Sequence, residues 1–361
     1  MATQEQYVET PCHRRFFFVG GVYVEDTATH FGGYTLKDQT YVECLTPIGG
    51  ARREFPIVLI HGGGQSGMNW LQTPDGRKGW ASFFLDQGYE LYLIDTASRG
   101  RSAMDLTQNY IQYPTGMAED FWTCTKAAAK WAQAKLHNQW PGTGRRGDPV
   151  FDQYYATILP SAVDLVAYQQ AQKDGVSALL KRIDRPSILL IHSQGAPGGW
   201  LAADAFPHLV KAIVAVEPNG PPFAGTHPHN GSAARSWGLT DIPMEFSPAI
   251  SGPSELHLTT IPSTEDGKEA VVLQDESHGR TVHKLKNLES IPVLIEMGEA
   301  SYHAGFDHAT VAFLRQAGVS CDFIKLEDIG IHGNGHMQML ELNNLQIAAV
   351  LHRWIEDKLY T

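Results

Sequence analysis

The sequence predicts an α/β fold with a mostly parallel sheet that is covered on both faces by helices. From Pro56 onward, short and almost continuously apolar segments alternate with longer segments of helical periodicity. Strands that are buried on both faces have this continuous apolar character. Hydrophobic residues make up 43% and charged residues 19% of the chain, which is the composition of a globular protein with a large core. Residues 1–361 are therefore interpreted as a single domain.

Charge and composition exclude several kinds of partner. The formal net charge is -11, which argues against nucleic acid or an anionic membrane surface as a partner. No stretch approaches the ~20 apolar residues of a membrane span. Residues 1–10 are polar and show no signal peptide, and the four cysteines lack C-x-x-C spacing. We therefore expect reduced thiols and a cytoplasmic location. A homodimer is compatible with the sequence.

The expected elements follow one another in a simple order. Two antiparallel edge strands, 16–24 and 39–45, precede the main sheet and are separated by a turn at Gly32-Gly33. The strands of the main sheet are expected at 57–60, 91–94, 188–191, 213–216, 293–295 and 323–326. Helices are expected at 80–87, 162–180, after Gly195, at 306–317 and at 345–358.

Two long segments interrupt this alternation. Residues 102–161 contain many aromatic residues, and residues 219–290 are rich in Pro, Gly, Ser and His. Both follow the carboxyl ends of strands, where ligands bind in open α/β sheets. Long connections in compact domains are often lids or binding surfaces. We interpret both segments as cap or lid insertions, and the aromatic content of the first favours an apolar or aromatic substrate.

A sharp turn is expected around Ser193. The apolar segment 188–191 leads directly into His192, Ser193, Gln194 and Gly195, and a Pro-bearing segment that can open a helix follows. This pattern resembles the nucleophile elbow, G-x-S-x-G, except that Ile191 stands at the first position. The alternative is that Ser193 only caps the N-terminus of a buried helix.

A glycine-rich loop follows the first strand of the main sheet. It reads His-Gly-Gly-Gly-Gln-Ser-Gly over residues 61–67. A phosphate-binding loop is disfavoured because no Gly-Lys-Ser/Thr follows and the glycines lack dinucleotide-fingerprint spacing. An oxyanion hole fits better, with the backbone N–H groups of Gly63 and Gln194 as donors. This combination resembles the α/β-hydrolases and favours Ser193 as the nucleophile.

A serine nucleophile needs a base and an acid. The base is expected in the glycine-dense loop 330–337, which holds His332 and His336. The glycines between them exclude the helix that metal binding at this spacing requires, and we expect no metal site. The acid has two candidates. Glu299 follows the strand 293–295, the usual position in α/β-hydrolases, and Glu217 ends the strand 213–216.

Several further motifs are similar to those of the bacterial esterase 713-like family of α/β-hydrolases. They are His61-Gly62 with Gly67-Met68-Asn69-Trp70, Thr73-Pro74-Asp75-Gly76-Arg77, Arg99-Gly100-Arg101-Ser102, His192-Ser193-Gln194, Val216-Glu217-Pro218, and His332-Gly333-Asn334 with His336-Met337 and Asn343-Asn344. In that family the elbow also lacks its first glycine. The resemblance implies Glu217 as the acid and His336 as the base. For His332 we expect a structural role, in which its imidazole holds the glycine-rich loop by hydrogen bonds.

These observations predict a serine hydrolase that cleaves a carboxylic ester or lactone through an acyl-enzyme, without a cofactor. Its triad is expected to be Ser193, His336 and Glu217. Two alternatives remain open on the same residues: hydrolysis of a C–C bond, and a cyclisation or rearrangement in a biosynthetic pathway. A third alternative is a catalytically silent module that binds a small molecule. The Gly62-Gly63-Gly64 run, Gly195 and the insertion 219–290 depart from the family, so the substrate stays open.

Overall fold

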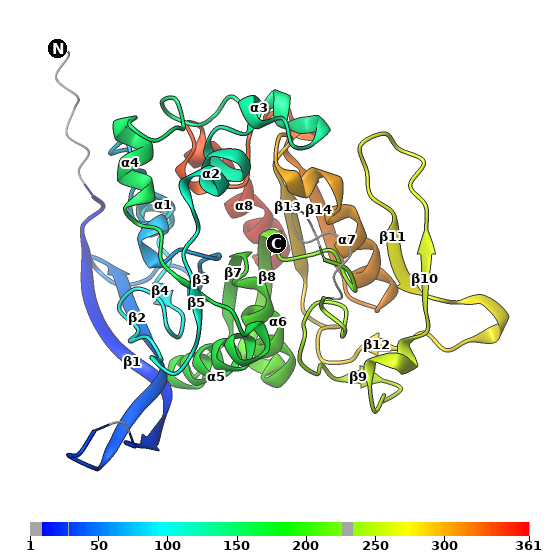
Figure 1. The fold of residues 1–361 in the computed structure, drawn as a ribbon, viewed down its shortest axis with the longest axis horizontal. Helices are drawn as coiled ribbons and strands as arrows, with labels where there is room; N and C mark the ends of the chain where they lie inside the picture. The colour runs from blue at the N-terminus through cyan, green and yellow to red at the C-terminus, as the bar shows by residue number, and fades with distance from the viewer. Residues whose placement is uncertain (1–8, 28, 226–233, 361) are drawn as a thin grey trace.

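The structure is a computed structural model that describes residues 9–27, 29–225 and 234–360. Its centre is an eight-stranded sheet with the order β1-β2-β4-β3-β7-β8-β13-β14 (Figure 1). The strands are β1 (Cys12–Glu25), β2 (Tyr34–Pro47), β3 (Ile57–Ile60), β4 (Leu91–Asp95), β7 (Ser187–Ser193), β8 (Val210–Pro218), β13 (Val293–Met297) and β14 (Cys321–Lys325). The six strands from β4 to β14 pair in parallel, whereas β1 and β2 pair antiparallel. The predicted α/β-hydrolase class of fold, with a mostly parallel sheet, is confirmed.

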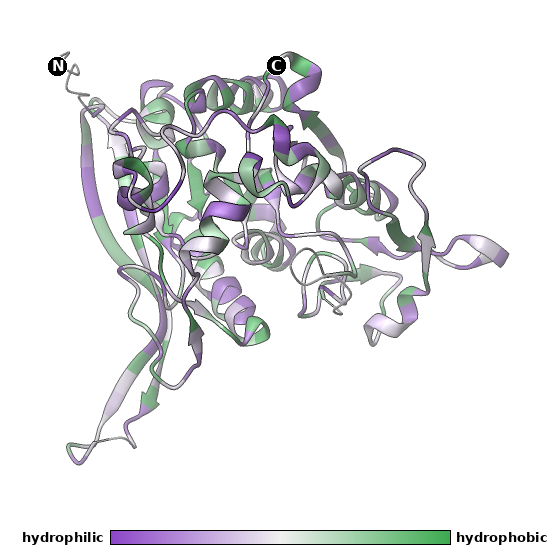
Figure 2. Ribbon diagram, turned by 45° about the horizontal axis from the view of Figure 1, so that its top comes forward, coloured by the Kyte–Doolittle hydropathy of each residue, from purple (hydrophilic) through white to green (hydrophobic). Residues whose placement is uncertain are grey.

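Helices bury both faces of this sheet. They are α1 (Trp80–Asp86), α5 (Leu165–Ile183), α6 (Ala196–Ala205), α7 (Asp307–Gln316) and α8 (Asn344–Leu359). Along β3, Val58 and Ile60 pack in a core cluster with side chains of α5, α6 and α7, while Ile57 and Leu59 pack in a second cluster with side chains of α1 and α8. Hydrophobic colour accordingly follows the central strands in Figure 2. The continuous apolar runs in the sequence reflect this burial on two faces.

The antiparallel hairpin is longer than expected from its apolar pattern. The sequence predicted strands at 16–24 and 39–45, whereas β1 and β2 pair from Cys12 with Pro47 to Glu25 with Tyr34. The additional residues at the start of β1 are His13, Arg14 and Arg15, whose side chains are exposed. A backbone ladder does not require buried side chains, so a polar strand end leaves no apolar signal. The distal end of the hairpin projects from the body of the molecule (Figure 1).

The two predicted insertions contain short elements. Segment 102–161 holds β5 (Tyr110–Ile111), α2 (Thr115–Ala118), α3 (Thr125–Ala128) and α4 (Pro149–Tyr155), and β5 pairs with β6 (Ser161–Ala162). Segment 219–290 holds β9 (Phe246–Ser247), β10 (Leu258–Ile261), β11 (Val271–Gln274) and β12 (Lys284–Leu285). Residues 226–233 of the second segment lie outside the described residues. The function of both segments as a cap stays a prediction. Nowhere in the described ranges is there a helix with the length and apolar character to cross a membrane.

Candidate active site

Ser193 is the last residue of β7, at a tight turn before α6. Its φ is 50°, in the left-handed region that non-glycine residues adopt at a cost of about 1–3 kcal/mol. The turn is held by the Gly195 N–H, which donates to the His192 carbonyl at 2.9 Å, and by the Asn219 N–H, which donates to the Ser193 carbonyl at 3.0 Å. A Cβ at Gly195 would lie 2.4 Å from the His61 carbonyl oxygen. This close approach explains why glycine follows the turn.

Glu217 lies beside Ser193 on the neighbouring strand. The register of β7 and β8 shifts here, so that His192 pairs with Val216 and Ser193 with Pro218. Glu217 falls in this irregularity with a φ of 42°, and its side chain is fully buried. Irregular pairing of this kind changes the direction in which a side chain points and is frequent near active sites. Both residues therefore have left-handed backbone at the same edge of the sheet.

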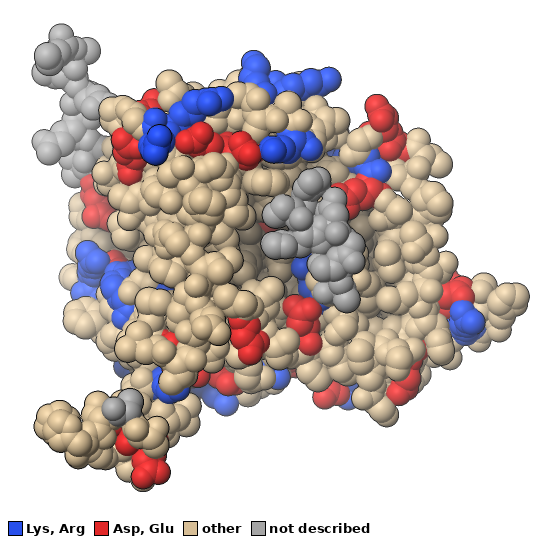
Figure 3. Space-filling view, viewed as in Figure 1, with Lys and Arg blue, Asp and Glu red and all other residues tan. Residues whose placement is uncertain are grey.

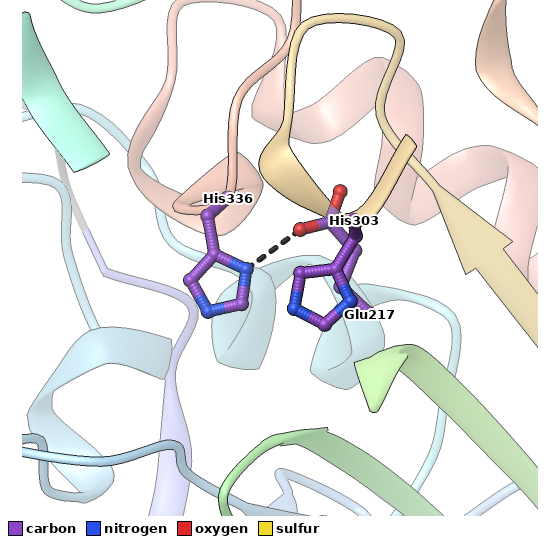
Figure 4. A group of neighbouring side chains, drawn as sticks. All are labelled: Glu217, His303 and His336. Atoms are coloured by element: carbon purple, nitrogen blue, oxygen red, sulfur yellow. Dashed lines mark hydrogen bonds and ion pairs between the residues drawn. The ribbon is translucent and has the colours of Figure 1, made fainter. Parts of the chain in front are cut away.

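His336 connects Ser193 and Glu217. Its Nε2 is 3.0 Å from Ser193 Oγ. Its Nδ1 is 2.6 Å from Glu217 Oε2, the contact that is dashed in Figure 4. His192 Nε2–H donates to the His336 carbonyl at 3.1 Å, which fixes the backbone beneath the imidazole. The structure thus brings the three residues together in the order that a hydroxyl nucleophile, a base and an acid require.

The Glu217 carboxylate is held by donors besides the imidazole. Ser301 Oγ–H donates to Oε2 at 2.6 Å, and Oε1 accepts from the Gly298 N–H at 2.8 Å and from Gln338 Nε2 at 3.1 Å. Burial raises the pKa of Glu217 to about 7, while nearby His303 and the three donors oppose this shift. Burial also lowers the pKa of His336 well below its ordinary value. The imidazole is consequently neutral near pH 7, as a general base has to be.

The other two candidates pair with each other, away from Ser193. Glu299 Oε1 lies 3.2 Å from His332 Nδ1, and Glu299 Oε2 accepts from the Gly333 N–H at 2.8 Å. The His332 side chain is 60% exposed. The pair ties the histidine loop to the end of β13. Glu341 holds the same loop from the other side by accepting from the Gly335 N–H at 2.9 Å.

The glycine loop after β3 packs directly against the turn at Ser193. A Cβ at Gly62 would lie 3.0 Å from the Ser193 Cβ, and one at Gly63 would lie 2.9 Å from Gln194 Oε1. Within the described residues, the backbone N–H groups of Gly63 and Gln194 donate to no other protein group. Arg99 Nη2 donates to Gln194 Oε1 at 3.0 Å and keeps this side chain in place. Two unused donors beside a serine hydroxyl are the arrangement of an oxyanion hole.

A cavity of about 640 Å³ opens in front of Ser193. Both insertions contribute to its wall. Aromatic and apolar residues of the wall include Ile111, Tyr113, Met117, Phe121, Trp122, Tyr302 and Phe306. Much of the face seen in Figure 3 carries neither acidic nor basic side chains. The cavity is suited to a largely apolar small molecule.

A second group of residues at the site was not expected from the sequence. They follow β13 and comprise Ser301, Tyr302, His303 and Asp307. The Tyr302 hydroxyl is 3.3 Å from His336 Nε2, and His303 Nδ1 is 2.9 Å from Asp307 Oδ1. The His303 ring stacks on the His336 ring with centroids 4.8 Å apart. Their position directly after a strand of the parallel sheet is the signal that could have identified them.

Three of these side chains also have the composition of a metal site. Ligand atoms of Glu217, His303 and His336 lie within 4.8 Å of one another, and all three residues are buried (Figure 4). However, His336 Nδ1 and Glu217 Oε2 are joined by a hydrogen bond, and both carboxylate oxygens accept from further donors. A metal would have to displace these hydrogen bonds. The donor set therefore fits a proton relay better than a resident ion.

Comparisons with known proteins agree with this geometry. No family model matches the chain. The chain is similar to the probable secreted lipase phiG of Fungal sp. (strain ATCC 74256), with 44% identity over 346 residues that cover 95% of this chain and 89% of the relative. Among solved structures it is similar to a bacterial esterase, with a TM-score of 0.61, 24% identity and 99% of each chain covered.

The expected cytoplasmic location is wrong. The relative is named a probable secreted lipase, which points to an extracellular protein. The expectation rested on the polar residues 1–10, of which 1–8 lie outside the described residues, and on scattered cysteines. All four cysteines are free, but disulfides do not decide the compartment of a chain this long, because a large core can stabilise it without them.

The resemblance to the esterase 713-like family, in contrast, is confirmed by these comparisons. The eight-stranded sheet, the turn at Ser193 and the likeness to phiG over nearly the whole length agree with one another. The chain belongs to the lipase and esterase family of α/β-hydrolases.

Proposed function

We propose that this protein is a serine hydrolase that cleaves a carboxylic ester, either open-chain or cyclic, through an acyl-enzyme. One observation carries the proposal: the continuous hydrogen-bonded connection from Ser193 Oγ through His336 to Glu217, with distances of 3.0 and 2.6 Å. The lipase relative and the esterase-like fold support an ester as the substrate.

The reaction follows from these positions. Ser193 Oγ attacks the ester carbonyl carbon while its proton moves to His336 Nε2, and Glu217 stabilises the imidazolium that forms. The backbone N–H groups of Gly63 and Gln194 stabilise the oxyanion of the tetrahedral intermediate. His336 then protonates the leaving alkoxide, and the acyl group stays on Ser193. Water attacks the acyl-enzyme with His336 again as the base, which releases the carboxylic acid and restores the serine hydroxyl.

The two insertions act as a cap in this proposal. Residues of both line the cavity in front of Ser193, including Tyr113 from the first and Arg235 from the second. A cavity wall of aromatic side chains excludes water and strengthens the electrostatic interactions at the reacting carbonyl. The cap therefore supports the acyl transfer as well as the binding of the substrate.

The proposal is tested with a fluorophosphonate probe and two serine variants. Ser193→Ala should abolish labelling and lower kcat by ~10⁶ towards short-chain aryl esters. Ser161 is the matched control, because it lines the same cavity and its hydroxyl donates to the Tyr113 hydroxyl at 2.8 Å. Ser161→Ala should still be labelled. Labelling that persists in Ser193→Ala would place the nucleophile elsewhere.

A further inference from the structure

Arg235 is a buried cation in the wall of the cavity. It lies in the second insertion and is 5% exposed. Its Nε–H donates to the Pro221 carbonyl at 2.7 Å, and its Nη2–H donates to the Ala224 carbonyl. Both carbonyls belong to the segment that continues from β8 beyond Glu217. The guanidinium is thereby fixed to the same strand end that carries the acid of the triad.

No acidic side chain of the described residues forms an ion pair with this guanidinium. Asp241 is nearby, but its Oδ1 accepts from the backbone N–H of Arg235 itself and its Oδ2 accepts from Gln169 Nε2 at 2.6 Å. The sequence of residues 226–233 contains neither Asp nor Glu. Burial lowers the pKa of Arg235 to about 10, although the charge of nearby Asp241 opposes this shift. The side chain is still a cation near pH 7.

Arg235 is thus a buried cation that feels the charge of Asp241 but has no carboxylate at ion-pair distance among the described residues. Burying a charge without such a partner is costly, and buried charges are usually paired in proteins. Guanidinium carries five N–H donors in one plane, and carbonyl bonds engage two of its nitrogens here. Its fork geometry matches a carboxylate, which it binds through two parallel charge-assisted hydrogen bonds. Arg235 also has a φ of 50°. Strained backbone of this kind persists where the surrounding structure requires a particular side-chain position.

We propose that the substrate is an ester that carries an additional ionised carboxylate, and that Arg235 binds this group. The inference rests on the proposed function and specifies its substrate class: a monoester of a dicarboxylic acid, or an ester whose alcohol part bears a carboxylate. The apolar residues of the cavity contact the remainder of the molecule, and the cation fixes its orientation towards Ser193. Arg235 is in this view a residue that determines specificity.

Matched esters test the assignment. The mono-4-nitrophenyl ester of glutaric acid is compared with the same compound methylated at its free carboxyl, and 4-acetoxybenzoate is compared with its methyl ester. Spontaneous hydrolysis is measured with Ser193→Ala and subtracted. For each pair, kcat/KM of the anionic ester is divided by kcat/KM of its neutral partner. For at least one pair this ratio should be ~10- to 100-fold lower in Arg235→Gln than in the wild type, mainly because KM for the anionic ester rises. Arg235→Lys should retain part of the ratio.

The control variant is Arg280→Gln, an exposed arginine of the same insertion that pairs with Asp275, and it should leave both ratios unchanged. A purely structural role of Arg235 would lower the rates for both members of each pair in proportion. Unchanged ratios in Arg235→Gln would therefore overturn the inference but not the proposed function. A different result would contradict the proposed function itself: the wild-type protein hydrolyses none of these esters, and the fluorophosphonate does not label Ser193.

A second measurement needs no variant at position 235. Glutarate should slow the reaction of the fluorophosphonate with wild-type Ser193, because its carboxylate occupies the guanidinium, whereas the uncharged diamide of glutaric acid should not. Equal protection by the two compounds, or protection by neither, would contradict the inference even if Arg235→Gln does not fold.

Discussion

Replacing Glu217 by Gln should disable the proton relay while leaving the site assembled. The carboxylate accepts from four donors: His336 Nδ1, Ser301 Oγ, the Gly298 N–H and Gln338 Nε2. An amide has only one acceptor oxygen, so its NH₂ group must face two of these donors. If the NH₂ faces His336, Nδ1 has to accept, and the imidazole proton moves to Nε2, where it points at Ser193 Oγ. This tautomer cannot take the serine proton.

The expected loss is ~10⁴ in kcat, or about 5 kcal/mol, by analogy with the same change in serine proteases. It should be measured at saturating substrate, so that weaker binding is not mistaken for lost chemistry. Glu299→Gln is the matched control, because Glu299 binds His332 and the Gly333 N–H instead. It should cost less than about tenfold in kcat. A large kcat defect confined to Glu299→Gln would refute the reasoning.

The remaining predictions concern the base, a buried carboxyl group and metal dependence. His336→Ala should be almost inactive at every pH, whereas His332→Ala should keep most of its turnover; the opposite result in rate assays would reverse the assignment. Activity requires a neutral His336 beside an ionised Glu217. Burial lowers the pKa of His336 and raises that of Glu217 to about 7, so the acidic limb of the wild-type kcat/KM profile should fall near pH 7, where Glu217 takes up a proton. Glu296 is fully buried without a hydrogen-bond partner among the described residues, and burial and the charge of Glu217 raise its pKa well above the ordinary value. The folded state therefore binds more protons than the unfolded state, and the Tm advantage of Glu296→Gln should be larger at about pH 8 than at about pH 5; a constant difference would contradict this sign. Dialysis against a chelator should leave esterase activity unchanged, and a loss that zinc restores would instead support metal binding at Glu217, His303 and His336.

Much of the fold could be predicted because its signals are local. The run 57–60 and the strand β3 coincide, and the other central strands differ from their predicted ranges only by a few terminal residues. A continuous apolar run in the sequence indicates a strand that is buried on both faces. Local signals could not decide whether Glu217 or Glu299 is the acid that contacts the histidine. Glu217 lies at the end of β8 and Glu299 follows β13. These are adjacent parallel strands only about 4.8 Å apart, and no local pattern says which strand end reaches the histidine.

Local sequence patterns could not predict which buried polar residues contact the residues of the site. Tyr302 and His303 contact His336 across more than 30 positions of sequence. Their position after β13 indicates only that they lie at the edge of the sheet where ligands bind, and not that they contact the histidine. The charge of Arg235 is notable only because nearby acidic side chains are absent or engaged elsewhere, which is a property of the packed structure. The location was misjudged for a related reason, since cysteine spacing describes covalent chemistry and not the route of a protein through the cell.

The three members of the proposed triad are anchored with unequal strength. Ser193 and Glu217 stand on hydrogen-bonded neighbouring strands, so their separation changes only if the centre of the sheet opens. His336 comes from a loop whose neighbouring Asn334 and Gly335 are both held by the buried carboxylate of Glu341, which also binds His137 of the first insertion. Mild heating should therefore release the base, together with that part of the insertion, while the sheet is still folded. We therefore expect the first loss of activity on heating to be reversible, with activity returning on cooling before any refolding of the sheet is needed.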